Sequence, residues 1–173
     1  ATEQHGPHLP ADTDWIIADG VVAKVLQLLP DTMPVTFLPT ERVGYSREHT
    51  NRPGVATLTY DGAVSRWIEI GEQLQAQGIR KFVMLNAHGG NAPLMTIVAT
   101  ELRARLNMLA VATSWTRFGL PFNVVTPEEK ARGIHGGEIE TSVMLALRSD
   151  LVRMDEARDF PSLQTEMERT AKH

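Results

Sequence analysis

The chain has 173 residues, which is enough for one domain with a sizeable core, and 42% of them are apolar, which excludes disordered and fibrous classes. Its formal net charge is −4, with 17 Lys and Arg against 21 Asp and Glu, and the basic residues form no cluster. We therefore expect no nucleic-acid partner. Because the chain has no cysteine, a bound metal ion would have to be held by His and carboxylate side chains.

The apolar runs are all far shorter than a membrane span, and no signal peptide opens the sequence. We therefore expect a cytoplasmic protein with no membrane partner. The chain starts at Ala1, and its first residues are typical of the end of a strand. From its length we expect residues 1–173 to form a single domain, and from this start we expect the chain to be a fragment that lacks the earlier residues of the strand.

Helices and strands are predicted to alternate along the chain. Apolar spacing predicts helices over 15–29, 60–78, 94–106 and 138–147, strands over 35–38, 81–85 and 109–113, and loops over 39–55 and 119–133. The continuous run at 82–85 is typical of a strand buried on both sides. This alternation predicts the α/β class, as a three-layer sandwich with a mainly parallel central sheet and helices on both faces. Ligands bind such sheets at the carboxyl ends of the strands.

The first candidate cluster precedes the first predicted helix. Glu3 and His5 are two residues apart, so in an extended segment their side chains project in the same direction. Asp14 returns from the start of the helix, and the three together form a ligand set suited to Zn or Mn. The alternative is that these are surface polar residues and that the aspartate only caps the helix.

Two further clusters follow strands or open helices. His88 comes directly after the strand at 81–85 and is followed by Gly89 and Gly90, with Asn91 as a candidate cap of the next helix. His135 precedes Glu138 and Glu140, which lie about 200° apart on a helix, so only one of them is expected to reach a shared centre. The alternatives are a structural histidine on a glycine turn and carboxylates that only stabilise the helix start.

Taken together, these motifs resemble the creatininase (creatinine amidohydrolase) family of dinuclear metal amidohydrolases. The matching segments are residues 3–10 with Asp14, 44–46 with Glu48 and His49, 53–54, 86–91, 135–137 and 140–142, and they occur in the family's order. The family's leading strand and closing segment are missing, so the resemblance implies truncation at both ends.

The resemblance also implies roles for these residues. Glu3, Asp14 and His88 would hold one divalent cation, and His5 with the bridging Asp14 would hold a second, with Zn the expected ion and Mn or Fe the alternatives. A metal-bound water would be the nucleophile. His135 would transfer the proton to the leaving nitrogen, a role that we favour over metal ligation.

The sequence departs from the family pattern at several positions. Gly90 stands where creatininases have a Glu ligand of the second metal, and we predict that Glu138 replaces it as a catalytic-site carboxylate. Gly89 replaces an aromatic residue of the substrate pocket, and Trp115 alone matches a substrate-clamping tryptophan. We predict that Ser46, Trp115 and Gly89 contact the substrate, and these departures argue against creatinine itself.

The resemblance favours an amidohydrolase that acts on a non-peptide or small cyclic amide or a formamide. The alternatives are a peptidase of a redox-peptide maturation pathway and a metal-binding scaffold without turnover. By analogy with the family, we expect a homo-oligomer, either a trimer or a hexamer.

Overall fold

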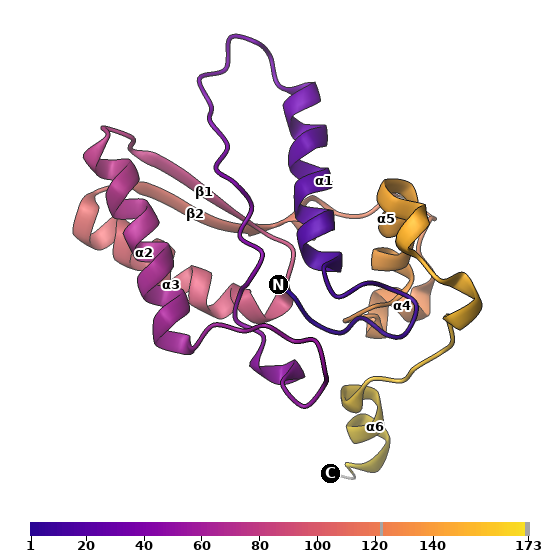
Figure 1. The fold of residues 1–173 in the computed structure, drawn as a ribbon. Helices are drawn as coiled ribbons and strands as arrows, with labels where there is room; N and C mark the ends of the chain where they lie inside the picture. Colours follow the sequence, from indigo (N-terminus) through magenta and orange to yellow (C-terminus); the bar gives the residue numbers. More distant parts are fainter. Residues whose placement is uncertain (122, 172–173) are drawn as a thin grey trace.

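The fold is described from a computed structural model that covers residues 1–121 and 123–171. Its elements are α1 (Thr13–Leu28), α2 (Tyr60–Ala76), β1 (Lys81–Asn86), α3 (Ala92–Leu106), β2 (Leu109–Ser114), α4 (Pro127–Arg132), α5 (Glu138–Arg148) and α6 (Leu163–Thr170). The long loop after α1 contains one 3-10 turn, η1 (Arg47–His49), as Figure 1 shows. None of the helices in this part of the chain has the length and apolar character needed to span a membrane.

The two strands form a parallel pair with α3 as the crossover between them (Figure 1). The register runs from Lys81 beside Leu109 to Asn86 beside Ser114, so both strands end at the same edge. Parallel strands require such a crossover, and the helix that supplies it packs back onto the strands. The predicted α/β class with a parallel sheet is confirmed.

The apolar core has two parts. The larger part joins α2, α3 and the inner face of the strands, with Trp67, Val98, Leu102 and Ala110 among its buried residues. The smaller part joins α1 to α5 through side chains that include Ile17 and Met144. Helices α1 and α5 therefore pack against each other, whereas α2 and α3 pack against the two strands.

The prediction that residues 82–85 are buried on both sides is wrong. Phe82 and Met84 pack toward α2 and α3, whereas Val83 is 63% exposed and the neighbouring Leu109 is 58% exposed. The run is apolar on both faces of the strand, but within the described residues helices cover only the face that carries Phe82 and Met84.

Two other local predictions also differ from the structure. Residues 35–38 form no strand, because β-branched composition alone supplies no hydrogen-bonding partner. The predicted loop over 119–133 contains α4, which Thr126 caps by accepting a hydrogen bond from the backbone N–H of Glu129. The Thr-Pro start of this helix is a recognised signal that the prediction overlooked. Phe122, within the same range, lies outside the described residues.

The N-terminal segment is held against the long loop. Thr2 and Ala56 form an isolated antiparallel bridge, with the backbone N–H of Ala56 donating to the carbonyl of Thr2 at 2.9 Å. The N–H of Glu3 donates to the carbonyl of Ala11 at 3.0 Å, which folds the segment back toward the start of α1. The polar residues that follow Thr2 are thereby placed beside the ends of the strands.

Candidate metal centre

Four of the predicted site residues meet in one buried cluster. Glu3 and His5 come from the N-terminal segment, Asp14 from the first turn of α1, and His88 from the residues directly after β1. Glu3 and His5 are fully buried, and Asp14 and His88 are at most 5% exposed. Burying so many ionisable groups is costly unless they compensate one another or bind an ion.

The ligand atoms in this cluster point toward one another. His88 Nδ1 lies 3.0 Å from Glu3 Oε1 and 3.3 Å from Asp14 Oδ2, and His5 Nε2 lies 3.2 Å from Asp14 Oδ1. Within the described residues, Glu3 Oε1 and Asp14 Oδ2 are buried and have no hydrogen-bond partner of good geometry. Asp14 Oδ2 also lies 3.3 Å from the amino group of Ala1. Two buried carboxylate oxygens that converge on one ring nitrogen fit the O and N donor set of a divalent cation.

The carboxylate that approaches this cluster from α5 is Glu140, whereas the predicted Glu138 lies away from it. Glu138 is exposed and accepts hydrogen bonds from the backbone N–H and the hydroxyl of Thr126, at 3.2 and 2.8 Å. One oxygen of Glu140 lies within 4.8 Å of ligand atoms of His5 and Asp14. The rotation of α5 decides which carboxylate faces inward. We call Glu3, His5, Asp14, His88 and Glu140 the inner cluster.

His135 lies beside the inner cluster in a defined orientation. Its Nε2 is 2.5 Å from the carbonyl oxygen of Gln4, an acceptor, so Nε2 carries a hydrogen and, in the neutral ring, Nδ1 carries the lone pair. That Nδ1 atom lies 3.6 Å from Glu3 Oε1, and the centre of the ring is 4.3 Å from that of His5, with the two rings tilted by 33°. The following Gly136 has a φ of 61°, and a Cβ there would lie 3.1 Å from the backbone carbonyl oxygen of His5, so both the conformation and the space favour glycine.

The three residues predicted to contact substrate lie in different surroundings. Ser46 is fully buried and its hydroxyl donates to Glu3 Oε2, so it orients a carboxylate and is not open to a substrate. Trp115 is partly buried against the apolar cluster between α1 and α5. Only Gly89 lies beside open space, since a Cβ there would meet nothing within 4 Å.

Asn91 occupies the N-cap position of α3 but forms no side-chain cap. Its Oδ1 accepts a hydrogen bond from the backbone N–H of Tyr45 at 2.9 Å, and its Nδ2 donates to Asn86 Oδ1 at 3.3 Å. The predicted cap is therefore wrong. The side chain instead ties the long loop to the end of β1.

The charges in the inner cluster shift one another's protonation. Burial alone would lower the pKa of His88, but hydrogen bonds and charges from Asp14 and Glu3 outweigh it and raise that pKa to about 10. Burial would raise the pKa of Asp14, but hydrogen bonds from His5 and His88 hold it well below its usual range. Burial raises the pKa of Glu140 above its usual value. Protonated imidazoles therefore balance the carboxylates when no cation is bound.

This balance predicts that cation binding releases protons. The pKa of about 10 means that His88 is protonated at neutral pH in the metal-free chain, and a bound ion must displace that proton. We expect Zn²⁺ affinity to rise with pH by about tenfold per unit for each proton displaced, and to weaken as pH falls. Calorimetry in buffers of different ionisation enthalpy measures the release, and a binding heat independent of buffer would contradict it.

Gly90 is enclosed, whereas its neighbour Gly89 is open. A Cβ at residue 90 would lie 2.2 Å from Glu48 Oε1, 2.5 Å from His88 Nε2 and 2.8 Å from the backbone carbonyl oxygen of Tyr45. We expect Gly90→Ala to lower the free energy of unfolding by about 1–3 kcal/mol, because the backbone has to move. Gly89→Ala is the matched control and should stay within about 0.5 kcal/mol of wild type in the same denaturant titration. Equal losses in both variants would refute the steric explanation.

Glu48 and His49 of η1 also approach this site. From the sequence they were part of the matching motifs, but no role was predicted for them. His49 Nε2 lies 3.6 Å from Glu3 Oε1, and its ring stacks on that of His135 at a centroid separation of 4.2 Å. Glu48 Oε1 lies 3.4 Å from His88 Nε2. Two adjacent residues that can bind metals, in a long loop predicted over 39–55, were the sequence feature that could have indicated a role in the site.

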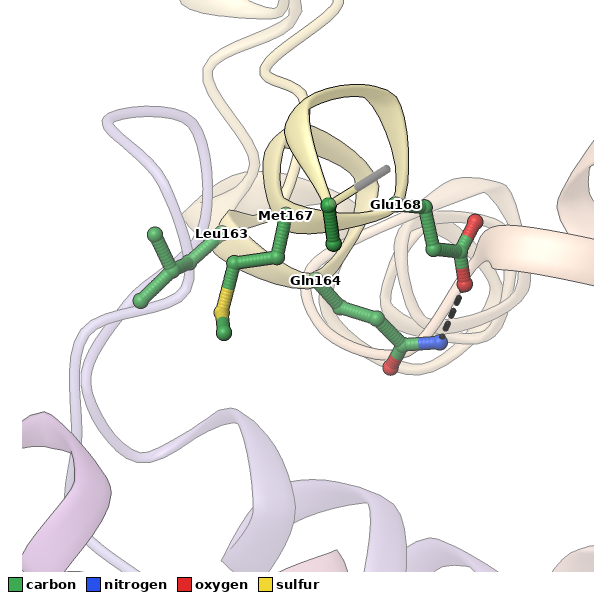
Figure 2. A pocket seen from close by; sticks show the side chains of 5 residues that line it. Leu163, Gln164, Met167 and Glu168 are labelled. Atoms are coloured by element: carbon green, nitrogen blue, oxygen red, sulfur yellow. Dashed lines mark hydrogen bonds between the residues drawn. The ribbon is translucent and has the colours of Figure 1, made fainter. Parts of the chain in front are cut away.

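A cavity of about 380 Å³ lies elsewhere, against α6 (Figure 2). It is lined by Leu163, Gln164, Met167, Glu168 and Ala171, all from that helix or the residue after it. No residue of the inner cluster lines this cavity, and its surface is almost entirely apolar. The cluster is the stronger candidate for a site with chemical activity.

Comparison with known proteins agrees with this geometry. The family described as creatinine amidohydrolase matches residues 1–173. A mycofactocin precursor peptide peptidase from Mycolicibacterium smegmatis is 32% identical over 90% of this chain and 58% of its own length. A creatinine amidohydrolase from Pseudomonas putida is 28% identical over 93% of this chain and 66% of its own length. The chain thus spans about three fifths of the first of these relatives.

Solved structures of creatininase also match. A creatininase variant complexed with creatine superposes with a TM-score of 0.77 at 26% identity, over 93% of this chain and 68% of the other. Zinc–zinc and manganese forms of creatininase each give a TM-score of 0.74 at 26% identity, over 93% of this chain and 67% of theirs. With a family match over its whole length, a creatininase-like fold and the family's motifs, this chain belongs to the creatininase family.

Proposed function

We propose that this chain is a divalent-metal-dependent amidohydrolase that cleaves the C–N bond of an amide. The observation that carries the proposal is the convergence of two buried carboxylate oxygens, Glu3 Oε1 and Asp14 Oδ2, on His88 Nδ1 at 3.0 and 3.3 Å. Family membership supports the reaction class.

The geometry supports two overlapping sets of ligands. Glu3, Asp14 and His88 would hold the first cation, and His5, Asp14 and Glu140 would hold the second, because the ligand atoms of each set lie within 4.8 Å of one another. Asp14 belongs to both sets and would bridge the ions. Zinc is the favoured ion, with manganese or iron as alternatives, and the zinc–zinc and manganese forms of similar creatininases support this choice.

The chain's own residues supply the remaining functions. A divalent cation bound here would lower the pKa of a bound water and polarise an amide carbonyl. His135, with its Nδ1 lone pair directed at the cluster, accepts a proton and delivers it to the leaving nitrogen. Ser46 fixes the orientation of Glu3. Gly89 leaves open space in which a substrate can approach.

The favoured substrate is a small cyclic amide, another non-peptide amide or a formamide, in line with the similarity to creatinine amidohydrolase. A second candidate is a peptide substrate, because the first listed similar protein is a peptidase of the mycofactocin precursor peptide. A metal-binding scaffold without turnover is the remaining alternative. Residues 1–173 are proposed to form one domain, and the cytoplasmic location and homo-oligomeric assembly stay predictions.

The test is metal-dependent hydrolysis. The chain is stripped of metal by a chelator, reloaded with Zn²⁺ or Mn²⁺, and assayed against formamides, cyclic amides and short peptides. We expect turnover only in the reloaded protein and on at least one amide class. Turnover that survives in the stripped protein would refute a metal-dependent reaction, and bound metal without turnover on any amide would favour the scaffold.

The second set of ligands predicts different effects for two glutamates of the same helix. Glu140→Gln should remove the cation held with His5, so one fewer metal ion binds per chain, because the neutral amide is a weaker ligand than a carboxylate. Glu138→Gln is the matched control and should leave the metal count unchanged, since Glu138 contacts Thr126 instead. Elemental analysis of both purified variants decides, and a loss in Glu138→Gln alone would reverse the assignment.

A further inference from the structure

The proposed function leaves one pair of ligand residues at this site without a role. Glu48 and His49, which we call the outer pair, belong to η1 and approach Glu3 from the side of the long loop. One ligand atom each from Glu3, Glu48 and His49 lies within 4.8 Å of the other two. Two carboxylates and an imidazole form a donor set that zinc and related ions accept.

Glu3 points a buried carboxylate oxygen, Oε1, at this set. Its Oε1 is fully buried and, within the described residues, has no hydrogen-bond partner of good geometry. The same atom lies 3.6 Å from His49 Nε2 and 3.0 Å from His88 Nδ1. A carboxylate oxygen has more than one lone pair, so Oε1 can bind a cation beside His49 in addition to its contact with His88.

The outer pair also faces solvent. Glu48 is 42% exposed and His49 is 22% exposed, whereas Glu3 is fully buried. An ion could reach this position from solution without crossing the inner cluster. Ring stacking on His135 at an interplanar angle of 25° holds the His49 side chain in place.

Gly90 provides the room that Glu48 uses. A Cβ at residue 90 would lie 2.2 Å from Glu48 Oε1, so any larger residue would displace this carboxylate. Gly90 stands where creatininases have a glutamate ligand, and in this chain the carboxylate of Glu48 from η1 lies against that position instead. Glu48 is not grouped with His5 and Asp14, so it does not simply restore the missing ligand of that pair.

We propose that Glu3, Glu48 and His49 hold a third divalent cation at the solvent-facing side of the inner cluster. Small side-chain rotations bring the three ligand atoms to bonds of about 2.0–2.2 Å from one ion. The position shares Glu3 with the inner cluster but involves neither Asp14 nor His88. It goes beyond the proposed function, because it concerns ion binding and requires no turnover.

The experiment counts ions in the full chain. Metal-free protein is titrated with Co²⁺ by equilibrium dialysis, with visible absorption as a second readout of coordination. We expect the wild type to bind one more Co²⁺ than either Glu48→Gln or His49→Gln. Glu41→Gln is the matched control, because Glu41 is an exposed carboxylate of the same loop that pairs with Arg66, and it should bind as many ions as wild type.

Asp14→Asn separates the inner and outer positions. It should lose the ions of the inner cluster and retain one that Glu48→Gln then removes in the double variant. Unchanged counts and affinities in both Glu48→Gln and His49→Gln, with thermal unfolding like wild type, would overturn the outer site and leave the proposed function intact. Conversely, an undiminished count in Asp14→Asn would overturn the inner centre alone. If one outer variant fails to fold, the other provides the test.

Discussion

Asp14→Asn is expected to remove both cations of the inner cluster at once and to reduce amide hydrolysis to background. Asp14 is the only residue common to the two proposed inner ligand sets within the described chain, with one oxygen near His5 and the other near His88. Metal content by elemental analysis and hydrolysis of the responsive amide measure the effect. A variant that keeps two inner cations and full activity would contradict the bridging role.

The same substitution should destabilise the metal-free chain. His5 and His88 are buried and raised in pKa partly by this carboxylate, so its loss leaves two cationic rings with less compensation. We expect the free energy of unfolding to fall by about 3 kcal/mol, the usual cost of breaking a buried pair. Asp12→Asn is the matched control, because Asp12 lies two residues away and forms no cap with its side chain, and it should remain close to wild type.

His135→Asn is expected to keep the metal ions and to slow hydrolysis by about 10²–10⁴-fold, the usual loss when a general acid or base is removed. The structure directs its Nδ1 into the site while Nε2 is occupied by the carbonyl of Gln4. The lone pair can therefore take a proton from the reaction.

Metal content separates this role from ligation, since Nδ1 also lies near ligand atoms of Glu3 and His5. Loss of an ion in His135→Asn would assign His135 as a ligand. Full activity with full metal content in this variant would show that His135 takes no part in the reaction. The pH dependence of the remaining activity gives an independent readout, because a lost proton-transfer group changes the shape of the profile as well as the rate.

Helix and strand positions near the site were predictable because local signals agree there. Thr59 caps α2 with its side chain, Gly78 follows the end of that helix with a φ of 84°, and apolar runs coincide with β1 and β2. Residues 35–38 show the limit of such signals, because a strand also needs a neighbouring backbone to pair with, and composition does not supply one.

By itself, the sequence determined which residue types were available for the site and roughly where along the chain they stand. Without cysteine, only His and carboxylate side chains could ligate, and His88 had to lie near the end of β1. The spacing of Glu3 and His5 predicted that they share one side of their segment, and the structure places both in the inner cluster.

Only the tertiary structure decided which of the remaining candidates belong there. The choice of Glu140 over Glu138 depends on the rotation of α5 against α1, which is set by apolar packing around Met144 and not by either glutamate. The approach of Glu48 to Gly90 depends on how a long loop folds back, with contacts more than 40 residues apart. Local propensity cannot encode such contacts, because they arise only when separate segments bury their surfaces together.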